Sequence, residues 1–311
     1  MKKPCVLITG GNGFIGSHLV DALVKDDYKV IVLKRSTSSL WRLRSTKGKI
    51  KFIDIDKVTM PQIFQNNKVE IIVHLATHYK KNDSLSSEKE LFEANVIFPE
   101  IIVREAINYG VKGFINTGTF FEYDCDQQPI SETSNIKPFN FYAKTKILFE
   151  EKLKKYESNL CINTLKIFTP FGERDNPKLI NTIIQKGLRR EPIKLSNGLQ
   201  KLDLIYIKDV VDSYIKSIER MLDVSYYPEY ENFNIGSGEP LSIRDVVSLI
   251  EEVLGYRLNV SWGSERKNEI KIAYADVKKA QKILGWKTNY TVKEGLSNCI
   301  NYMKKGEILD N

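Results

Sequence analysis

The sequence predicts an α/β fold in which a doubly wound parallel sheet is followed by a smaller α+β domain. Apolar runs alternate with amphipathic stretches through the first half of the 311-residue chain. A glycine-rich turn over residues 10–16 joins the first apolar run to the first amphipathic stretch. After Phe168 the alternation loosens into shorter segments separated by loops. These observations place the regular sheet in the first half of the chain.

The predicted strands of that half are apolar on both sides, as in a parallel sheet that helices cover on both faces. They are residues 5–9, 29–34, 51–55, 70–76, 113–118 and 161–168. The amphipathic stretches between them predict helices over 14–26, 88–109 and 141–157. Because strands and helices that alternate in this way form right-handed βαβ units, we expect a Rossmann-type sheet.

The second half of the chain is less regular. A loop over 169–177 leads to a helix over 179–190. Residues 191–222 then return through strands to another helix, and residues 233–255 read as a strand, a turn and a helix. Such a mixture predicts a compact α+β unit rather than more βαβ repeats.

A length of 311 residues fits two domains or one large domain. We expect a cofactor-binding domain over 1–165, to which a segment near 203–235 returns. The substrate-binding domain then comprises 166–202 and 236–311.

Composition and charge restrict the partners of the protein. The four cysteines lack the paired spacing of a metal site, so we expect free thiols in a reducing cytoplasm and no metal. No apolar segment is as long as a membrane span, so no membrane partner is expected. Basic clusters over 34–51, 144–155 and 186–194 contribute to a net charge of +8. They suit solvated faces or the attraction of anionic small molecules, and they lack the interleaved aromatic residues of a nucleic-acid platform.

The turn after the first predicted strand contains a G-x-G-x-x-G motif formed by Gly11, Gly13 and Gly16. Glycines allow a pyrophosphate to approach the backbone, and the following helix N-terminus offers free N–H groups. The motif therefore predicts a dinucleotide site, the alternative being a glycine turn without a ligand.

The second strand ends in Lys34 and Arg35, where an NAD site usually has an acid that binds the ribose 2′-OH. Two cations favour the 2′-phosphate of NADP(H), unless both side chains simply point to solvent.

Tyr142 and Lys146 lie four residues apart on a predicted helix, so their side chains share one face. An ammonium nearby favours the phenolate, and about 4 kcal/mol would bring the pKa of a tyrosine to about 7. A phenol tuned in this way can donate a proton to a carbonyl oxygen as hydride arrives, or do the reverse. Thr117 and Thr119 come at the carboxyl edge of the sheet, where ligands of such folds bind. An exposed helix face that carries Tyr and Lys by chance is the alternative interpretation.

Taken together, these motifs resemble an extended short-chain dehydrogenase/reductase of the nucleotide-sugar epimerase/dehydratase group. The resemblance covers nearly the whole chain and rests on segments in family order, "TGGNGFIG", "HLAT", "NTGTFFEY", "YIKDVVDSY", "FNIGSGEPLSI" and "ADVKKAQKILGWK". It implies that Thr119, Tyr142 and Lys146 are catalytic. The cofactor residues that the prediction includes are Gly10, Gly13, Phe14, Ile15, Gly16, Lys34, Arg35, Asp54, Ile55, Leu75, Ala76, Thr77, Asn95, Thr117, Tyr142, Lys146 and Phe168.

The same resemblance implies a nucleotide-sugar site. The expected substrate residues are His78, Thr119, Phe120, Lys178, Lys194 and Arg266. His78 is equally compatible with a solvent-facing loop position. The family has a second arginine that binds the substrate diphosphate, and this chain has Leu202 at that position. The family's diphosphate contacts are therefore less directly applicable to this chain.

The residues after Thr119 bear on the reaction. The 4,6-dehydratases of the family carry Asp-Glu there, whereas this chain has Phe120 and Phe121, so dehydration is disfavoured. Cys125 is near the site, but no matching histidine completes the Cys/His pair of the 3,5-epimerase/reductases. The sequence also resembles the 4-ketoreductases that make CDP-abequose, CDP-paratose and dTDP-fucose-type sugars. Lys166 fits that group, whereas many other relatives carry Arg.

We therefore expect NADPH-dependent reduction of the C4 ketone of a nucleotide-activated 4-keto-6-deoxyhexose or 3,6-dideoxyhexose. The substrate would be linked to CDP or dTDP and serve bacterial surface polysaccharide (O-antigen) synthesis. An NAD-dependent nucleotide-sugar 4-epimerase and a non-catalytic NADP-binding protein are the alternatives. By resemblance, the helices over 88–109 and 141–157 would pair with a second subunit in a homodimer, although packing within one chain explains their apolar residues equally well.

Overall fold

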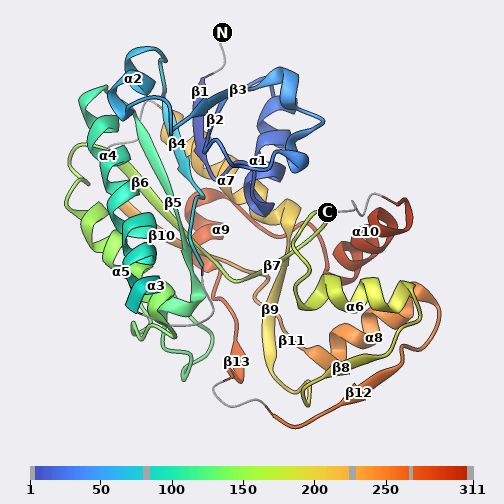
Figure 1. Cartoon of the computed structure of the whole chain (residues 1–311). Helices are drawn as coiled ribbons and strands as arrows, with labels where there is room; N and C mark the ends of the chain where they lie inside the picture. The colour runs from blue at the N-terminus through green and yellow to red at the C-terminus, as the bar shows by residue number, and fades with distance from the viewer. Residues whose placement is uncertain (1–3, 80–84, 224–228, 266–268, 307–311) are drawn as a thin grey trace.

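A computed structural model describes residues 4–79, 85–223, 229–265 and 269–306. Its centre is a seven-stranded sheet in the order β10-β6-β5-β4-β1-β2-β3, with every neighbouring pair parallel (Figure 1). The strands are β1 (Cys5–Thr9), β2 (Lys29–Lys34), β3 (Lys51–Asp54), β4 (Ile71–His74), β5 (Gly113–Thr119), β6 (Cys161–Ile167) and β10 (Tyr230–Ile235). The Rossmann-type α/β fold is thus confirmed, and the six predicted strands lie within a few residues of the observed ones.

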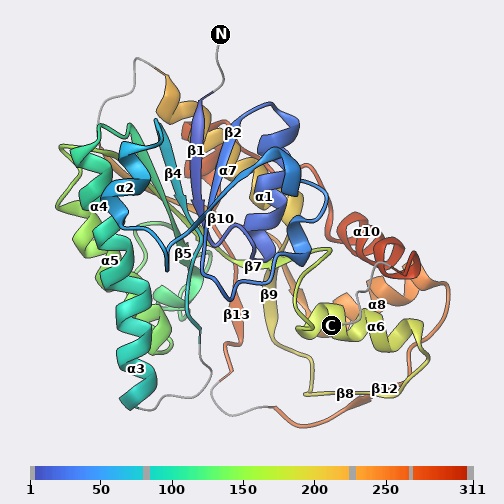
Figure 2. The ribbon, with the colours of Figure 1, turned by 45° about the horizontal axis from the view of Figure 1, so that its top comes forward.

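Helices cover both faces of this sheet, and alternate strand residues bury against each layer. Val6 and Ile8 of β1 pack with one layer, while Leu7 between them packs with the other. The first layer contains α1 (Phe14–Lys25) and α7 (Ile207–Leu222), and the opposite layer contains α2 (Met60–Gln65), α4 (Phe98–Asn108) and α5 (Phe141–Lys154) (Figure 2). Burial on both faces explains why these strands are continuous apolar runs.

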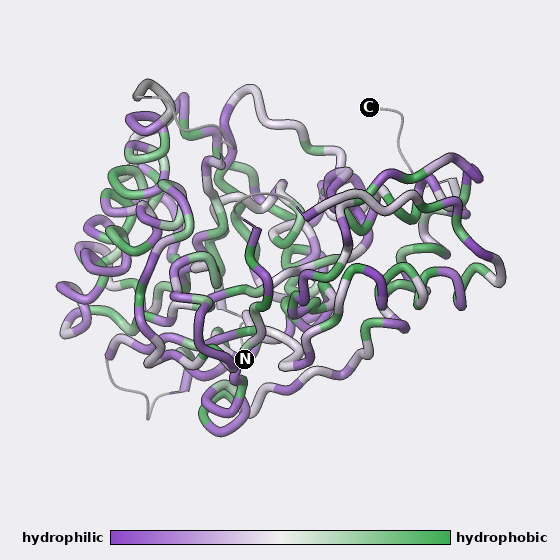
Figure 3. Tube along the Cα trace, turned by 90° about the horizontal axis from the view of Figure 1, so that it is seen from below, coloured by the Kyte–Doolittle hydropathy of each residue, from purple (hydrophilic) through white to green (hydrophobic). Residues whose placement is uncertain are grey.

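A second, smaller sheet is built around β9 (Lys201–Tyr206). Its partners are β7 (Thr169–Phe171), β11 (Pro240–Ser242) and β13 (Ile272–Ala273). Beside it, β8 (Ile193–Leu195) pairs with β12 (Val260–Trp262). Three amphipathic helices pack together over this part of the chain, α6 (Leu179–Leu188), α8 (Ile243–Leu254) and α10 (Val292–Lys304). Figure 3 shows the alternation of hydrophobic and hydrophilic residues along the chain that allows such packing.

Two details differ from the expected arrangement. The returning segment begins later than residue 203, because β9 pairs in the smaller sheet and only α7 and β10 join the large one. The helix expected over 88–109 is divided into α3 (Leu85–Phe92), a π-helical turn η3 (Glu93–Ile97) and α4. π-helical turns inside helices often occur at functional sites.

The helix α9 (Lys278–Leu284) contacts β10 and α7, so the C-terminal half of the chain touches the large sheet again. Within the described ranges, no helix combines the length and the apolar character needed to cross a membrane.

Candidate active site

The turn between β1 and α1 has room for glycine only. Gly10 has a φ of +68°, and a Cβ placed on it would lie 2.5 Å from the Ala76 nitrogen. A Cβ on Gly16 would lie 2.2 Å from the Gly10 oxygen. The Gly13 N–H donates to that same oxygen at 2.9 Å, which closes the turn. The backbone of β1 therefore approaches the loop after β4 and the start of α1 more closely than side chains would permit.

The N-terminus of α1 is open toward this turn. Its N-cap residue is Gly13, which offers no side-chain cap, and the first helical turn carries no acidic residue. The first N–H groups of the 12-residue helix are therefore available to an anion. Together with the close-packed glycines, this arrangement fits the diphosphate of a nicotinamide dinucleotide.

At the far end of the expected cofactor site, Lys34 forms an ion pair with Asp54. Its Nζ lies 2.8 Å from Oδ2 of Asp54, at the end of the neighbouring strand β3. Ser36 Oγ donates to the same carboxylate oxygen at 2.9 Å. The hydrogen bond from Lys34 lowers the pKa of Asp54 below its usual value, followed by that from Ser36. Arg35 is exposed, so it is the cation that remains available to a phosphate there.

Thr77, Leu75 and Ala76 follow β4 beside the glycine turn. The Ala76 N–H donates to Thr9 Oγ1 at 3.1 Å, which ties this loop to the end of β1. Ile15 and Phe14 open α1, and Phe14 packs in the core beneath it. These predicted cofactor residues therefore surround one end of the sheet.

Tyr142 and Lys146, the expected catalytic pair, both lie on α5, as the spacing predicts. Lys146 Nζ lies 5.8 Å from the centroid of the Tyr142 ring. Burial lowers the pKa of Lys146 to about 8, while Glu122 and Glu150 oppose this shift. Burial raises the pKa of Tyr142 above its ordinary value, and a hydrogen bond with Thr77 opposes the rise. The expected lowering of the tyrosine pKa is therefore not found, because loss of hydration outweighs the hydrogen bond with Thr77.

Thr119 ends β5 and begins a short 3-10 turn, η4 (Phe120–Glu122). Its backbone N–H donates to Glu122 Oε1 at 2.7 Å, and its hydroxyl accepts a 3.4 Å hydrogen bond from the Phe121 N–H. The hydroxyl of Thr117, by contrast, contacts the His74 carbonyl oxygen at 2.9 Å and the Tyr214 hydroxyl at 2.8 Å. Of the two threonines, Thr119 therefore has the hydroxyl that is less committed to the protein.

Asn95 lies in the π-helical turn and forms hydrogen bonds with the loop after β4. Its Oδ1 accepts from the His78 N–H at 2.7 Å, and its Nδ2 donates to the His78 carbonyl oxygen at 3.0 Å. Nδ2 also lies 3.1 Å from Thr145 Oγ1 on α5. Because both ends of the amide are engaged, Asn95 positions the 77–78 loop against α5.

The predicted substrate residues are spread more widely. His78 is half-buried, with Nε2 3.5 Å from Glu90 Oε2. Phe120 is buried and stacks on Phe168, with ring centroids 5.3 Å apart. Lys178 is the N-cap residue of α6, with Nζ 3.4 Å from Asp175 Oδ1, and Lys194 is exposed on β8. Arg266 lies outside the described residues.

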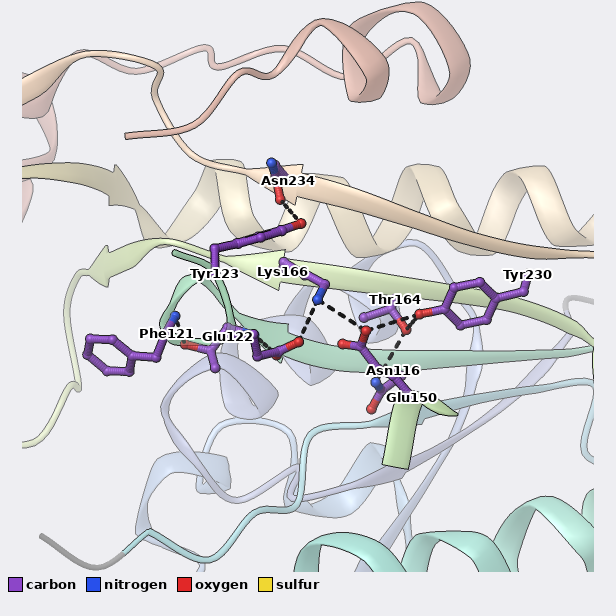
Figure 4. A network of polar contacts seen from close by, with 10 residues as sticks. Asn116, Phe121, Glu122, Tyr123, Glu150, Thr164, Lys166, Tyr230 and Asn234 are labelled. Carbon is purple, nitrogen blue, oxygen red and sulfur yellow. Dashed lines mark hydrogen bonds and ion pairs between the residues drawn. The ribbon is translucent and has the colours of Figure 1, made fainter. Parts of the chain in front are cut away.

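Sequence reasoning missed a buried cluster of charges behind Thr119. Lys166 on β6 contacts both Glu122 and Glu150 (Figure 4). The signal available in the sequence was Glu122, placed three residues after Thr119 as in a capping box. The sequence gives no sign that Lys166 is buried with two glutamates, because Glu122 and Glu150 come from other elements.

Comparison with known proteins agrees with this geometry. The chain is 28% identical over 308 residues to a putative UDP-glucose 4-epimerase of Methanocaldococcus jannaschii, covering 96% of this chain and 98% of that protein. It is 26% identical over 299 residues to the CDP-abequose synthase of Salmonella muenchen, covering 95% and 97%. The solved structure of MoeE5 in complex with UDP-glucose and NAD superposes with a TM-score of 0.84 at 26% identity, covering 97% and 99%.

These similarities span almost the full length of each protein, so they extend to both sheets. They support a nicotinamide cofactor at the glycine turn and a nucleotide sugar as the second ligand. Residues 6–236 match the sequence model of the NAD-dependent epimerase/dehydratase family. The chain belongs to the NAD-dependent epimerase/dehydratase family.

Proposed function

We propose that the protein uses NADPH to reduce the C4 ketone of a nucleotide-activated 4-keto-6-deoxyhexose or its 3,6-dideoxy counterpart, linked to CDP or dTDP. The observation that carries the proposal is the placement of Tyr142 beside Lys146 on α5, with phenylalanines following Thr119 where a dehydratase has acids. The setting is the synthesis of sugars for bacterial surface polysaccharide, including O-antigen, in the cytoplasm.

In this reaction Tyr142 protonates the oxygen that develops at C4. Because burial raises its pKa, the phenol carries its proton at neutral pH, which suits a proton donor. The Lys146 ammonium stabilises the phenolate that remains, and the Thr119 hydroxyl donates a hydrogen bond to the ketone oxygen. NADPH, when bound at the glycine turn, supplies the hydride.

The side of the site next to Thr119 is aromatic. Phe120 and Phe121 have ring centroids 4.4 Å apart, and Phe121 stacks on Phe139 at 5.4 Å. None of these rings can move protons at C5 or C6 of a sugar, so they offer no route to dehydration. An apolar wall suits a sugar that has already lost hydroxyl groups, because it leaves no buried hydroxyl without a partner.

At the other end of the substrate, Lys178, Lys194 and Arg266 would bind the diphosphate, and His78 would contact the sugar. Cations on separate elements suit a flexible, doubly charged linker. For the cofactor, Arg35 supports NADPH, because its guanidinium is exposed and no acid follows β2 at the position that binds a ribose 2′-OH.

A second candidate is an NAD-dependent 4-epimerase. It is favoured by the similarity to the M. jannaschii protein and to MoeE5, whose structure contains NAD. It is also favoured by the ion pair between Lys34 and Asp54, which removes one of the two cations expected to select a 2′-phosphate.

One assay separates the two candidates. NADPH absorbance would be followed with CDP- and dTDP-linked 4-keto-6-deoxyglucose and with the CDP-linked 3,6-dideoxy-4-ketone, with NADH in parallel. Rapid oxidation of NADPH with one nucleotide supports the reductase and identifies its substrate. No oxidation with any ketone, together with NAD released when the protein is denatured, would overturn the reductase and favour the epimerase.

We also infer a homodimer from the surface of the α3–α4 segment. Phe92, Ile97 and Ile101 are 37%, 38% and 44% exposed, although all three are large and apolar. They follow one another along consecutive turns of α3, η3 and α4. A row of apolar residues of this kind is typical of a surface that a second copy covers.

A further inference from the structure

Three charged side chains lie together inside the protein, behind the sheet edge that carries Thr119. We call Glu122, Glu150 and Lys166 the charge cluster (Figure 4). Lys166 Nζ contacts Glu122 Oε2 and lies 3.1 Å from Glu150 Oε2. The exposed fractions of these side chains are 0% for Glu122, 2% for Lys166 and 9% for Glu150. Buried ion pairs contribute little net stability, because the cost of desolvating the charges offsets their attraction.

The surroundings of the cluster hold it in one arrangement. The Tyr230 hydroxyl lies 3.2 Å from Glu150 Oε2, and the ring of Tyr123 lies 4.7 Å from Lys166 Nζ. A Cβ on Gly118 would lie 3.0 Å from Oε1 of both glutamates. The glycine in β5 therefore allows the two carboxyl groups to approach the strand from behind.

The cluster is joined directly to the expected catalytic threonine. Glu122 Oε1 accepts the Thr119 backbone N–H at 2.7 Å, while Glu122 Oε2 contacts Lys166. One carboxylate thus bridges the turn that carries Thr119 and the neighbouring strand β6. In Figure 4 the Phe121 side chain points away from the cluster, whereas Glu122 points into it.

Lys146 lies four residues before Glu150 on α5, so these two buried side chains share the face of the helix that carries the cluster. Glu122 and Glu150 both favour the charged form of Lys146, with Glu122 having the larger effect. Tyr142 on the same helix and His74 on β4 are the other titratable groups near this ammonium, and Lys166 on β6 pairs with both glutamates. Burial, followed by the charge of Glu122, raises the pKa of Glu150 to about 8, so Glu150 is largely protonated at neutral pH and Glu122 is the main source of negative charge on this side of Lys146. His74 is buried and neutral and adds no charge.

We propose that Glu122 is a positioning residue of the active site, which fixes the Thr119 backbone with one carboxylate oxygen and keeps the buried Lys146 ammonium charged through its negative charge. Glu150 supports it from α5, and Lys166 holds the two carboxyl groups together. The inference rests on the proposed function only in that Lys146 serves Tyr142.

The test measures the titration of Lys146 without any substrate. Lysines labelled with ¹³C at Cε are followed by NMR from pH 6 to 11, and the signal missing from Lys146→Arg identifies Lys146. Glu122→Gln keeps an oxygen that can accept the Thr119 N–H but removes the charge. We expect this variant to lower the Lys146 midpoint by about one pH unit, because a nearby opposite charge favours the ammonium. Glu151→Gln, the same change on the exposed face of α5, is the matched control and should leave the midpoint unchanged.

Glu150→Gln provides a second arm and should lower the midpoint by less than Glu122→Gln. A folded Glu122→Gln protein with an unchanged Lys146 midpoint would overturn the proposal. If Glu122→Gln does not fold, an unchanged midpoint in Glu150→Gln overturns it instead. In an active enzyme, the alkaline limb of kcat/KM should move to lower pH in Glu122→Gln with the midpoint. A wild-type protein that turns over none of the ketones contradicts the proposed function, but the titration still decides the role of Glu122.

Discussion

Lys34 and Asp54 join the carboxyl ends of β2 and β3 through a 2.8 Å ion pair. The pair leaves Arg35 as the exposed cation at the position where the 2′-phosphate of NADP would lie. It also holds the Asp54 carboxylate, which could otherwise repel that phosphate. The proposed preference for NADPH therefore depends mainly on one guanidinium.

Arg35→Ala tests this dependence. A charge-assisted hydrogen bond contributes about 1.5–3 kcal/mol, so the KM for NADPH should rise about 10-fold or more while the KM for NADH changes little. Steady-state kinetics with both cofactors measures the change. Lys29→Ala removes a cation from the opposite end of β2 and serves as the control. Equal KM values for NADPH in Arg35→Ala and the wild type would refute the assignment.

Tyr142→Phe removes only the phenol oxygen. General acid catalysis by a positioned side chain contributes about 10²–10⁴-fold, so turnover should fall by at least that range. NADPH binding, measured by cofactor fluorescence, should stay within about twofold, because the ring and its packing remain. Tyr109→Phe, on an exposed helix end, controls for loss of a hydroxyl. Turnover retained in Tyr142→Phe would exclude Tyr142 as the proton donor.

Much of this arrangement could be predicted from the sequence because it follows from local patterns. The apolar runs indicated β1 to β6, and the four-residue spacing indicated that Tyr142 and Lys146 share a helix face. Partners chosen by strand register could not be predicted in the same way. Asp54 meets Lys34 only because β2 and β3 pair with these two residues side by side.

The charge cluster was also beyond local reasoning, since Glu122, Glu150 and Lys166 come from a 3-10 turn, a helix and a strand. Each of these residues reads as an ordinary surface charge when its segment is considered alone. The expected returning segment near 203–235 includes most of β9, which instead pairs in the smaller sheet. Its pairing with β7, β11 and β13 is determined by tertiary contacts rather than by its own sequence.

His74 should make the protein less stable in acid. It is buried, with Nδ1 2.8 Å from Thr9 Oγ1, and burial lowers its pKa from 6.5 to about 3. The unfolded chain binds a proton below about pH 6.5 and the folded chain does not, so stability is lost as pH falls from 6.5 toward 3. Between pH 7.5 and 5 the loss from this group is about 2 kcal/mol.

Urea unfolding at the two pH values measures this loss. His74→Gln removes the titrating group, so the difference between pH 7.5 and 5 should shrink by about 2 kcal/mol relative to the wild type. Any constant cost of the substitution cancels in that comparison. An unchanged difference would mean that His74 is not neutral in the folded protein.

Gly16→Ala should damage both the fold and the cofactor site. Its Cβ would lie 2.2 Å from the Gly10 oxygen, so α1 would have to move away from the turn. Overpacking of this kind costs about 1–3 kcal/mol or more, and the displaced helix would no longer offer its N–H groups to a diphosphate. Urea unfolding and NADPH fluorescence report the two effects. Gly48→Ala, where a Cβ meets nothing within 4 Å, should change neither.

Ile101→Glu tests the inferred homodimer. A carboxylate on the exposed apolar row of α3 to α4 would be desolvated by a second copy, which costs far more than the contact gains. Size-exclusion chromatography with light scattering should give the wild type a mass of about twice the 35.8 kDa of the chain, and the variant the mass of a monomer. Ile136→Glu places the same charge on a residue that is 51% exposed outside this row and should remain dimeric. A monomeric wild type would show that this apolar row is not covered by a second copy, while a dimeric Ile101→Glu protein would place the interface on another surface.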